Sequence, residues 1–484
     1  MREFALEIAG ERVPGAERRA VLSPWDGRQV GEVSEAGPEE MDAAVEAAVG
    51  AIPRMAAMPK SRRIAILHAM AESVGERAED LAGIICDEAG KPIRYARGEV
   101  ARAAENLMAA AAACRELDRE MVPLDVAKAG SGRIGLVRRF PVGPVAAVSP
   151  FNFPLNLAVH KLAPAVAAGC PVVLKPASRT PMSALVLRQM ALDAGLPAEA
   201  LSVLPASREV ADSLVTDHRI KLLSFTGSSE VGWDMKARAG KKRVVLELGG
   251  NAACIVGPDA DPDQVAPKLV SGCFAYSGQV CISVQRIYVF EGLFDRMLEE
   301  LLRATGKLAA VGDPADPEVM VGPMIDDASR ERTLARTARA RDAGARILCG
   351  GEAEGPCVQP TLITGADPNL EVVAEEAFAP LAVIEPVSGW DEAIARAADT
   401  RFGLQVGVFT DDLGAVWRCW EEIEVGGVIH NDTPQFRVDH MPYGGVRDSG
   451  FGREGPRYAI EEMTEPRLLA LRPDWDGKRG SGGS

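Results

Sequence analysis

Residues 145–176 read VAAVSPFNFPLNLAVHKLAPAVAAGCPVVLKP, in which two short apolar runs flank a longer one. The outer runs, Val145–Pro150 and Pro171–Pro176, have the length and the apolar character of buried strands. Between them, Leu155–Ala168 is long enough for a helix and carries helix-forming Ala and Leu. A strand, a helix and a second strand of continuous apolar character predict a parallel sheet covered by helices on both faces.

The same alternation extends outward in both directions along the chain. Before this stretch, residues 38–117 are rich in alanine at helical spacing. Downstream, the pattern predicts the helices Ser183–Ala194 and Leu293–Gly306 and the strands Leu201–Leu204, Lys221–Phe225, Arg286–Phe290 and Leu381–Glu385. The elements after Gly250 form a second series that runs to about Gly445. Two α/β lobes with a cleft between them are the simplest architecture for both series.

Length and charge limit the function classes. The 484 residues are too many for one hydrophobic core and predict two or three domains. With 54 basic against 69 acidic side chains, the net charge of −15 disfavours nucleic acids and anionic membrane surfaces as partners. No apolar run reaches the roughly 18 residues of a membrane span, and the early acids Glu3 and Glu7 argue against a signal peptide. We therefore expect a cytoplasmic protein that binds neither nucleic acid nor membrane.

The nine cysteines are scattered without a Cys-x-x-Cys pair, and none of the five histidines is spaced beside them as a ligand. This pattern predicts neither a disulfide framework nor a metal site, and it suits a reducing compartment. The Gly- and Ser-rich end, residues 476–484, is expected to be a flexible tail.

Four short segments, far apart in the chain, carry side chains that belong to one chemistry. They are Pro150-Phe151-Asn152-Phe153-Pro154, Leu174-Lys175-Pro176, Glu247-Leu248-Gly249-Gly250-Asn251 and Gly278-Gln279-Val280-Cys281. Each is a weak signal alone, but oxidation of an aldehyde through a thioester needs a cysteine, an amide donor and a carboxylate base. In this order and at these separations, the segments resemble the aldehyde dehydrogenase superfamily, from about residue 20 to about residue 470.

The resemblance implies three catalytic residues. Cys281 would be the nucleophile, because a thiolate adds readily to a carbonyl near neutral pH. Asn152, with the backbone N–H of Cys281, would stabilise the oxyanion, and Glu247 would activate water to hydrolyse the thioester. Each has a structural alternative: a cysteine that only fills the core, an asparagine that only shapes a turn, and a solvent-facing glutamate at a strand end. Cys273 is the competing nucleophile, in a setting that matches no known pattern.

A second set of residues would bind the coenzyme, NAD or NADP. A strand that runs into a glycine turn and a helix, as in Ser224–Gly232, offers backbone N–H groups and a helix N-terminus to a diphosphate. Its Gly-x-x-x-x-Gly spacing differs from the usual dinucleotide fingerprint, so the resemblance carries the assignment. Lys175 would bind the adenosine ribose and Glu376 the nicotinamide ribose. The full set of implied cofactor residues is Ser149, Pro150, Phe151, Lys175, Ser178, Gly227, Ser228, Leu248, Glu376 and Phe378.

Ser178 bears on the choice between NAD and NADP. Many NAD-preferring members carry a glutamate three residues after the lysine, where it binds the ribose hydroxyls and repels a 2′-phosphate. Here Ser178, followed by Arg179, removes that repulsion, which predicts dual use or a preference for NADP.

The loop Asn431–Gly445 bears on the substrate. It resembles members that oxidise small hydroxylated or anionic aldehydes, of the lactaldehyde and glyceraldehyde types. Phosphonoacetaldehyde enzymes tend to carry a histidine and an arginine where this chain has Phe153 and Val280, which favours a small neutral or weakly polar aldehyde instead. The candidate substrate residues are Phe153, Arg437, His440 and, at the entrance, Arg102. An ion pair between Arg437 and Asp439, or a place in a subunit interface, is an equally good interpretation of Arg437.

The resemblance also implies a fold of two Rossmann-like α/β lobes and a β-ribbon that links subunits. The dinucleotide-binding domain would comprise residues 1–121 and 141–249, and the catalytic domain residues 250–445. The ribbon would comprise residues 122–140, where Arg133–Arg139 alternates like a strand, and residues 464–475. We expect a homodimer or a homotetramer.

Three other functions are alternatives. A CoA-acylating enzyme forms the same thioester, but such relatives lack a glutamate at the position of Glu247, which favours hydrolysis to the free acid. A non-catalytic structural relative would be expected to lose Cys281 or Glu247. An unrelated Rossmann reductase would need a Tyr-x-x-x-Lys pair, and the five tyrosines provide none.

Overall fold

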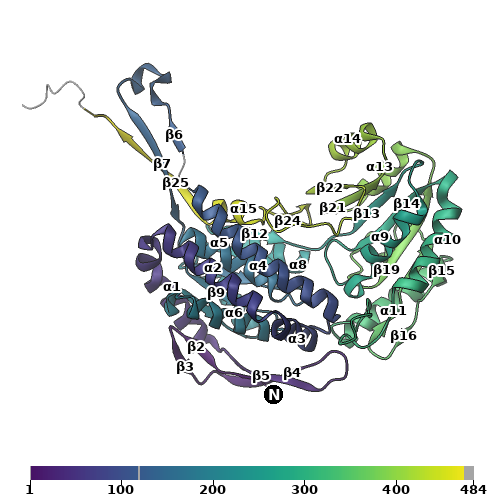
Figure 1. The fold of residues 1–484 in the computed structure, drawn as a ribbon, viewed down its shortest axis with the longest axis horizontal. Coiled ribbons are helices and arrows are strands. Elements are labelled where there is room, and N and C mark those ends of the chain that lie inside the picture. The colour runs from purple at the N-terminus through teal and green to yellow at the C-terminus, as the bar shows by residue number, and fades with distance from the viewer. Residues whose placement is uncertain (1, 118–119, 474–484) are drawn as a thin grey trace, which may run out of the picture.

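The structure of the protein, a computed structural model, describes residues 2–117 and 120–473. Two α/β lobes lie side by side, and a narrow β-ribbon projects from the first lobe (Figure 1). Each lobe is built on one mostly parallel sheet, which confirms the predicted α/β class. Among the described residues, no helix is both long and apolar enough to cross a lipid bilayer.

The sheet of the first lobe carries the strands on which the site is built. In spatial order it contains β10 (Leu201–Val203), β9 (Val172–Lys175), β8 (Val145–Val148), β11 (Leu222–Thr226), β12 (Arg243–Glu247) and β24 (Gly450–Phe451). The first five strands are parallel, whereas β24 pairs antiparallel with β12. The chain therefore returns to the first lobe after completing the second, through residues 446–463 that the predicted domains left unassigned.

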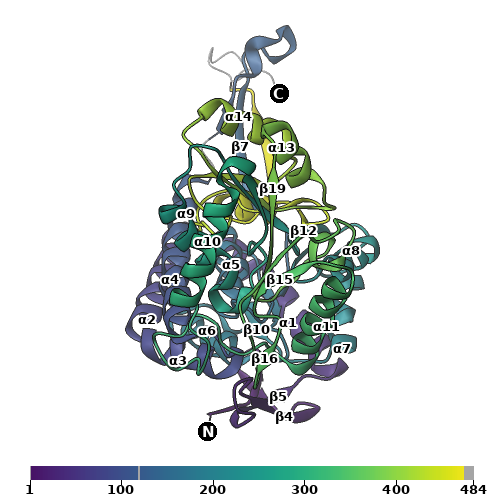
Figure 2. The same cartoon turned by 90° about the vertical axis from the view of Figure 1, so that its right-hand side faces the viewer.

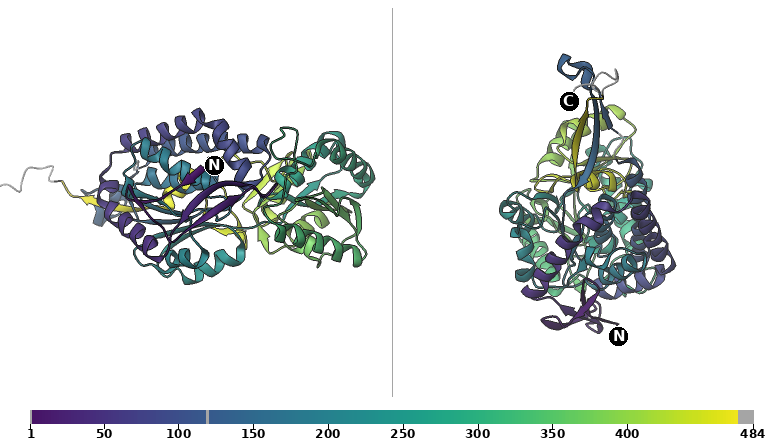
Figure 3. Two further views of the ribbon diagram at one scale, coloured as in Figure 1. Left: turned by 90° about the horizontal axis from the view of Figure 1, so that it is seen from below. Right: turned by 90° about the vertical axis from the view of Figure 1, so that its left-hand side faces the viewer.

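The strands of this sheet are apolar throughout because both of their faces are covered. Val145 and Ala147 pack into one hydrophobic cluster, while Ala146 between them packs into another on the opposite face. Helix α5 (Asn156–Ala168), which follows β8, is buried at every position and ends at Gly169, whose φ of +85° suits glycine. In the view from below, helices cover both faces of this sheet (Figure 3, left).

The remaining elements of the first lobe are mostly helical. Its other helices are α1 (Pro38–Ala57), α2 (Lys60–Glu76), α3 (Ala78–Ala89), α4 (Ile93–Glu116), α6 (Met182–Asp193), α7 (Arg208–Thr216), α8 (Ser229–Arg238) and α15 (Pro456–Glu462). The N-terminal strands, which the sequence patterns did not reveal, are β1 (Arg2–Phe4), β2 (Leu6–Ile8), β3 (Glu11–Val13), β4 (Glu17–Leu22) and β5 (Gln29–Glu35). These strands and the β-ribbon lie at opposite ends of the molecule (Figure 2).

The second lobe repeats the α/β plan with a larger sheet. In spatial order the sheet contains β15 (Arg346–Cys349), β18 (Thr361–Thr364), β19 (Leu381–Val387), β14 (Val284–Phe290), β13 (Ala252–Val256), β21 (Gln405–Phe409) and β22 (Gly427–His430). Its helices are α9 (Pro262–Phe274), α10 (Glu291–Leu308), α11 (Asp327–Asp342), α12 (Glu371–Ala374), α13 (Trp390–Ala398) and α14 (Leu413–Glu422). All strand pairs are parallel except β15 with β18.

The β-ribbon is a three-stranded antiparallel sheet. Strand β25 (Thr464–Leu471) pairs along its whole length with β7 (Ile134–Pro141), and β6 (Glu120–Val122) pairs with the other edge of β7. This pairing confirms the predicted ribbon, while its role in linking subunits stays a proposal, as does the division into domains. Residues 474–475 of the predicted ribbon and the predicted tail, 476–484, lie outside the described residues.

Candidate active site

The predicted catalytic and cofactor segments meet at one cavity of about 690 Å³ between the lobes. Four of its lining segments follow the carboxyl ends of the parallel strands β8, β9, β11 and β12, the usual place for a ligand in an α/β sheet. The second lobe supplies the turn around Cys281, the segment of Glu376 and Phe378, and part of the loop 431–445. Of the predicted site residues, only His440 does not line the cavity; it is exposed instead.

A strained turn places Cys281 in the cavity wall. Tyr276, Ser277 and Gly278 have φ values of +52°, +56° and +63°, a run of left-handed backbone that L-residues rarely adopt. A Cβ on Gly278 would lie 2.1 Å from the carbonyl oxygen of Ala379, so only glycine fits there. A hydrogen bond stabilises the turn: the Ser277 hydroxyl donates to the carbonyl oxygen of Gly322 at 2.8 Å.

Cys281 is a thiol that must be activated. Burial raises its pKa to about 11, against the opposing effects of a hydrogen bond with Tyr443 and the positive charge of Arg437. The sulfur lies 3.1 Å from the Tyr443 hydroxyl. The competing candidate, Cys273, is fully buried in the hydrophobic core of the second lobe and does not line the cavity. Its burial raises the pKa of its thiol as well, so nothing favours it as a nucleophile.

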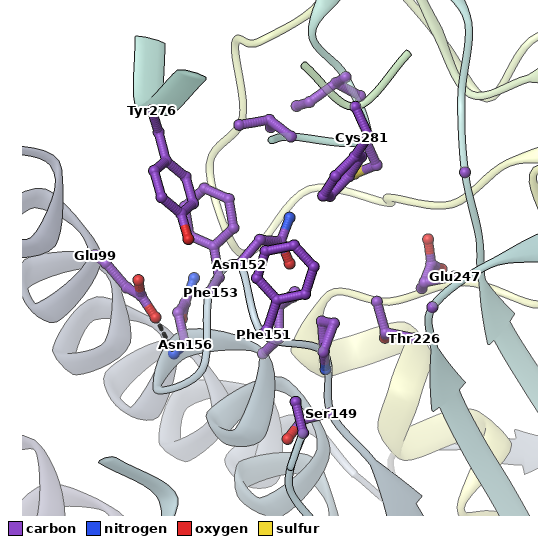
Figure 4. A pocket seen from close by; sticks show the side chains of 18 of the residues that line it. Glu99, Ser149, Phe151, Asn152, Phe153, Asn156, Thr226, Glu247, Tyr276 and Cys281 are labelled. Carbon is purple, nitrogen blue, oxygen red and sulfur yellow. Dashed lines mark hydrogen bonds between the residues drawn. The ribbon is translucent and has the colours of Figure 1, made fainter. Parts of the chain in front are cut away.

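Asn152 faces the cavity from the loop between β8 and α5 (Figure 4). Its side-chain nitrogen donates one hydrogen bond to the backbone oxygen of Gln279, at 2.9 Å, across the gap between the lobes. A primary amide has two N–H groups, so the second is available to another acceptor. This hydrogen bond anchors the Asn152 side chain to the segment of the second lobe that leads to Cys281.

Glu247 ends β12 as a buried carboxyl group without a partner. It is 3% exposed, and neither of its oxygens makes a hydrogen bond with the described residues. Burial raises its pKa well above the usual range and nearby Glu454 raises it further, while Arg437 lowers it. Gly444 leaves room for the carboxyl group, because a Cβ there would lie 2.8 Å from Oε1. Such a group is free to hydrogen-bond a water molecule in the cavity.

Arg437 lines the cavity but already has partners. Its guanidinium lies 3.5 Å from the centre of the Tyr443 ring and 3.2 Å from an oxygen of Glu454. Asp439 is 3.7 Å from Arg437 and also accepts two hydrogen bonds from Arg102, at 2.7 and 3.1 Å. The ion pair between Arg437 and Asp439, one of the three interpretations of Arg437 that the sequence left open, is therefore present.

The predicted cofactor residues line the other end of the cavity. Lys175 donates to the Ser178 hydroxyl at 3.3 Å, Gly227 leads into the N-terminus of α8, and Phe151 packs edge-on against Phe378. Glu376 accepts a hydrogen bond from the Gly250 backbone N–H at 2.9 Å, and burial raises its pKa to about 7. A cluster of lysine, carboxylate and helix N-terminus is what a ribose and a diphosphate require.

Two further observations test whether a dinucleotide fits these residues. The buried Ser149 hydroxyl lines the cavity without a hydrogen-bond partner among the described residues, so it is available to a ligand. At Gly249, a Cβ would lie 2.5 Å from the Glu376 carboxylate, so glycine there preserves the space beside that group. The residues present therefore fit NAD or NADP.

Sequence reasoning missed several residues of the cavity wall, among them Lys91, Arg94, Glu99 and Tyr443. Tyr443 lies inside the loop that was singled out, but nothing in its spacing indicates that it meets Cys281. Glu99 could have been found from the sequence, because it lies on the same buried face of α4 as Ala96 and Ala103. A charged residue in an apolar stripe is rarely left without a partner, so its presence indicates a specific contact.

Comparisons with known proteins show what the chain as a whole is similar to. Residues 13–469 match the model of the aldehyde dehydrogenase family. The chain is 40% identical over 472 residues to 3-sulfolactaldehyde dehydrogenase of Priestia aryabhattai, covering 97% of this chain and 98% of the relative. Aldehyde dehydrogenase 21 of Physcomitrella patens, solved with its reaction product succinate, has a TM-score of 0.95 and 42% identity over 97% of this chain and 98% of that one. Glyceraldehyde-3-phosphate dehydrogenase GapN of Methanocaldococcus jannaschii, solved with NADP, has a TM-score of 0.90 and 35% identity over 95% of this chain and 100% of that one.

Proposed function

Because the chain belongs to the aldehyde dehydrogenase family, we propose that it oxidises a small aldehyde to the free carboxylic acid through a thioester on Cys281. It is an oxidoreductase that acts on aldehydes with NAD or NADP as the acceptor. The finer proposal rests on one observation: Cys281, Asn152 and Glu247, from three distant segments, line a single cavity.

The proposed mechanism assigns one task to each of these residues. The Cys281 thiol loses its proton to solvent as its sulfur adds to the aldehyde carbonyl, and the free N–H of Asn152 donates to the oxyanion that forms. NAD(P)⁺, when bound, would accept the hydride that leaves the carbonyl carbon, and the loss of that hydride turns the adduct into the thioester. Glu247 then takes a proton from water as that water attacks the thioester, because a carboxyl group of raised pKa is a stronger base than an ordinary one. The Cys281 sulfur leaves, and the acid is released.

The experiment that tests the function uses the wild-type protein without CoA. We expect each molecule of reduced nicotinamide to be accompanied by one molecule of free acid, measured by absorbance and by NMR. A reaction that starts only after CoA is added, and yields acyl-CoA, would contradict hydrolysis and support the CoA-acylating alternative.

The substrate we propose is a short aldehyde that carries an acidic group. The similar proteins are named for, or were solved with, compounds that carry an acidic group: a sulfonate, a dicarboxylate and a phosphate. The cavity wall contains Arg94 and Arg102 on α4, with Gly98 between them. Asp439 neutralises Arg102, whereas Arg94 makes no ion pair with any described residue. The proposed substrate class therefore differs from the neutral or weakly polar aldehyde that the sequence favoured.

Replacing Arg94 with alanine tests this substrate class. We expect kcat/KM for succinic semialdehyde to fall about 10-fold, mainly through KM, because a charge-assisted hydrogen bond is lost. Activity with propanal should stay unchanged. Arg97→Ala is the matched control, because Arg97 lies on the same helix but pairs with Glu79 on the surface, 2.9 Å away. An equal loss with both aldehydes would contradict a contact with the acidic group.

Replacing Ser178 with glutamate tests the coenzyme proposal. The new carboxylate would lie beside Lys175 and repel a 2′-phosphate, so we expect KM for NADP to rise about 10-fold while KM for NAD does not rise. Ser178→Gln is the control, because glutamine has the size of glutamate without its charge. If both variants change the two KM values alike, charge at residue 178 does not discriminate between the coenzymes.

A further inference from the structure

A buried ion pair lies behind Asn152. Lys91, just before α4, and Glu99, within α4, are 0% and 1% exposed, and the Lys91 nitrogen lies 2.7 Å from Glu99 Oε2. Buried ion pairs add little stability compared with apolar packing, so a specific geometric role is the best reason for one.

The pair contacts the Asn152 loop at its middle and at its C-terminal end. The Lys91 ammonium donates to the backbone oxygen of Asn152 at 2.9 Å. Glu99 Oε1 accepts from the backbone N–H groups of Leu155 and Asn156, at 2.9 and 3.0 Å, where α5 begins (Figure 4 shows the contact with Asn156). The turn that carries Asn152 is therefore held from α4, while the side chain of Asn152 is held by Gln279 of the other lobe.

Lys91 has no donor left for a substrate. Its ammonium group bonds Glu99 and Asn152, and it lies 3.3 Å from the centre of the Phe153 ring. An ammonium group has three N–H donors, and these three contacts account for them. Although Lys91 lines the cavity, its contacts are those of a group that orients its neighbours.

We propose that Lys91 and Glu99 are positioning residues, which hold the Asn152 amide where the oxyanion forms. This inference rests on the proposed function, since it requires Asn152 to act on the adduct of Cys281. The same amide would face the oxyanion of the intermediate in thioester hydrolysis, because that oxyanion lies on the same carbon. A shift of the amide by about 1 Å can reduce a rate about 100-fold.

The test is a double-mutant cycle between Lys91→Met and Asn152→Ala. The quantity measured is the rate of the first turnover, in which NAD(P)H forms. We expect Lys91→Met to slow that turnover about 10- to 100-fold in the wild-type background. In the Asn152→Ala background the same substitution should slow it less than about 2-fold, because the amide to be positioned is already absent. The rate of thioester hydrolysis, measured in the same variants, should follow the same non-additive pattern, because its intermediate carries an oxyanion on the same carbon.

Two further variants separate positioning from general damage to the fold. The Lys91→Met, Glu99→Gln double variant removes both charges but keeps an amide oxygen for the N–H groups of Leu155 and Asn156, so it stays testable if Lys91→Met alone does not fold. Glu88→Gln is the matched control. Glu88 is a buried carboxylate on α3 that accepts from Met182 and Ser183 at the start of α6, at 2.7 and 3.0 Å, away from the cavity. We expect it to lower thermal stability without slowing the first turnover.

Equal slowing by Lys91→Met in both backgrounds, or a wild-type first turnover in Lys91→Met, would overturn the inference. An Asn152→Ala variant with a normal first turnover would overturn the proposed role of Asn152 together with it. Loss of the first turnover in Asn152→Ala, with additive loss in the double variant, would leave the proposed function intact and reject the positioning role alone.

Discussion

Replacing Cys281 with alanine is expected to lower kcat at least about 10⁴-fold, with no NAD(P)H formed from any aldehyde. Without the sulfur no adduct forms, so hydride transfer has no tetrahedral intermediate to start from. The measurement is NAD(P)H absorbance over a panel of short aldehydes, with both coenzymes. Coenzyme binding, measured by the quenching of tryptophan fluorescence, should persist because Cys281 is not among the proposed cofactor residues.

Cys273→Ala is the matched control for this variant. Cys273 is the same residue type eight positions earlier, buried in the core of the second lobe. We expect some loss of thermal stability and near wild-type kcat, because only a small core volume is removed. A Cys281→Ala protein with more than a tenth of wild-type activity, or a Cys273→Ala protein with none, would contradict the assignment of the nucleophile.

Replacing Glu247 with glutamine is expected to leave one rapid turnover per active site and then stall the enzyme, with kcat lower by about 10²- to 10⁴-fold. The first turnover survives because addition and oxidation need Cys281 and Asn152, whereas release of the acid needs an activated water. Stopped-flow absorbance would give the amplitude and rate of the burst and the slow rate that follows.

The pH dependence provides a second check on Glu247. Its pKa is raised, so the carboxyl group must lose its proton before it can act as a base. The rate of thioester hydrolysis in the wild type should therefore rise with pH through the raised pKa and level off above it. In Glu247→Gln that rise should disappear. If the burst of NAD(P)H in Glu247→Gln were slowed as much as kcat, a role of Glu247 confined to hydrolysis would be contradicted.

The elements of this fold are predictable from sequence where they depend on local pattern. Strands β8 and β9 and helix α5 carry continuous apolar runs, because each is buried on all sides, and the predicted bounds agree with the structure to within two residues. Strands β1, β2, β3 and β24 escaped prediction, because segments of two or three residues carry little periodic signal. The longer strands β4 and β5 escaped it as well, because polar and charged residues interrupt their apolar pattern.

The site is predictable where a residue stands in a motif and not where long-range packing selects it. Cys281, Asn152 and Glu247 lie in recognisable segments, and the structure places them in one cavity. Lys91 meets Asn152 across 61 residues and Tyr443 meets Cys281 across 162, separations that no local pattern records. His440, chosen for its chemistry within the loop, is exposed outside the cavity.

The central claim is that a covalent acyl group forms on Cys281 and is hydrolysed with the help of Glu247. The most direct measurement is peptide mass spectrometry of Glu247→Gln after brief reaction with an aldehyde and NAD(P)⁺, quenched in acid. We predict that the peptide containing Cys281 gains the mass of the acyl group, and that hydroxylamine removes it. Unmodified Cys281 after a full burst of NAD(P)H, or an acyl group on another residue, would contradict the account.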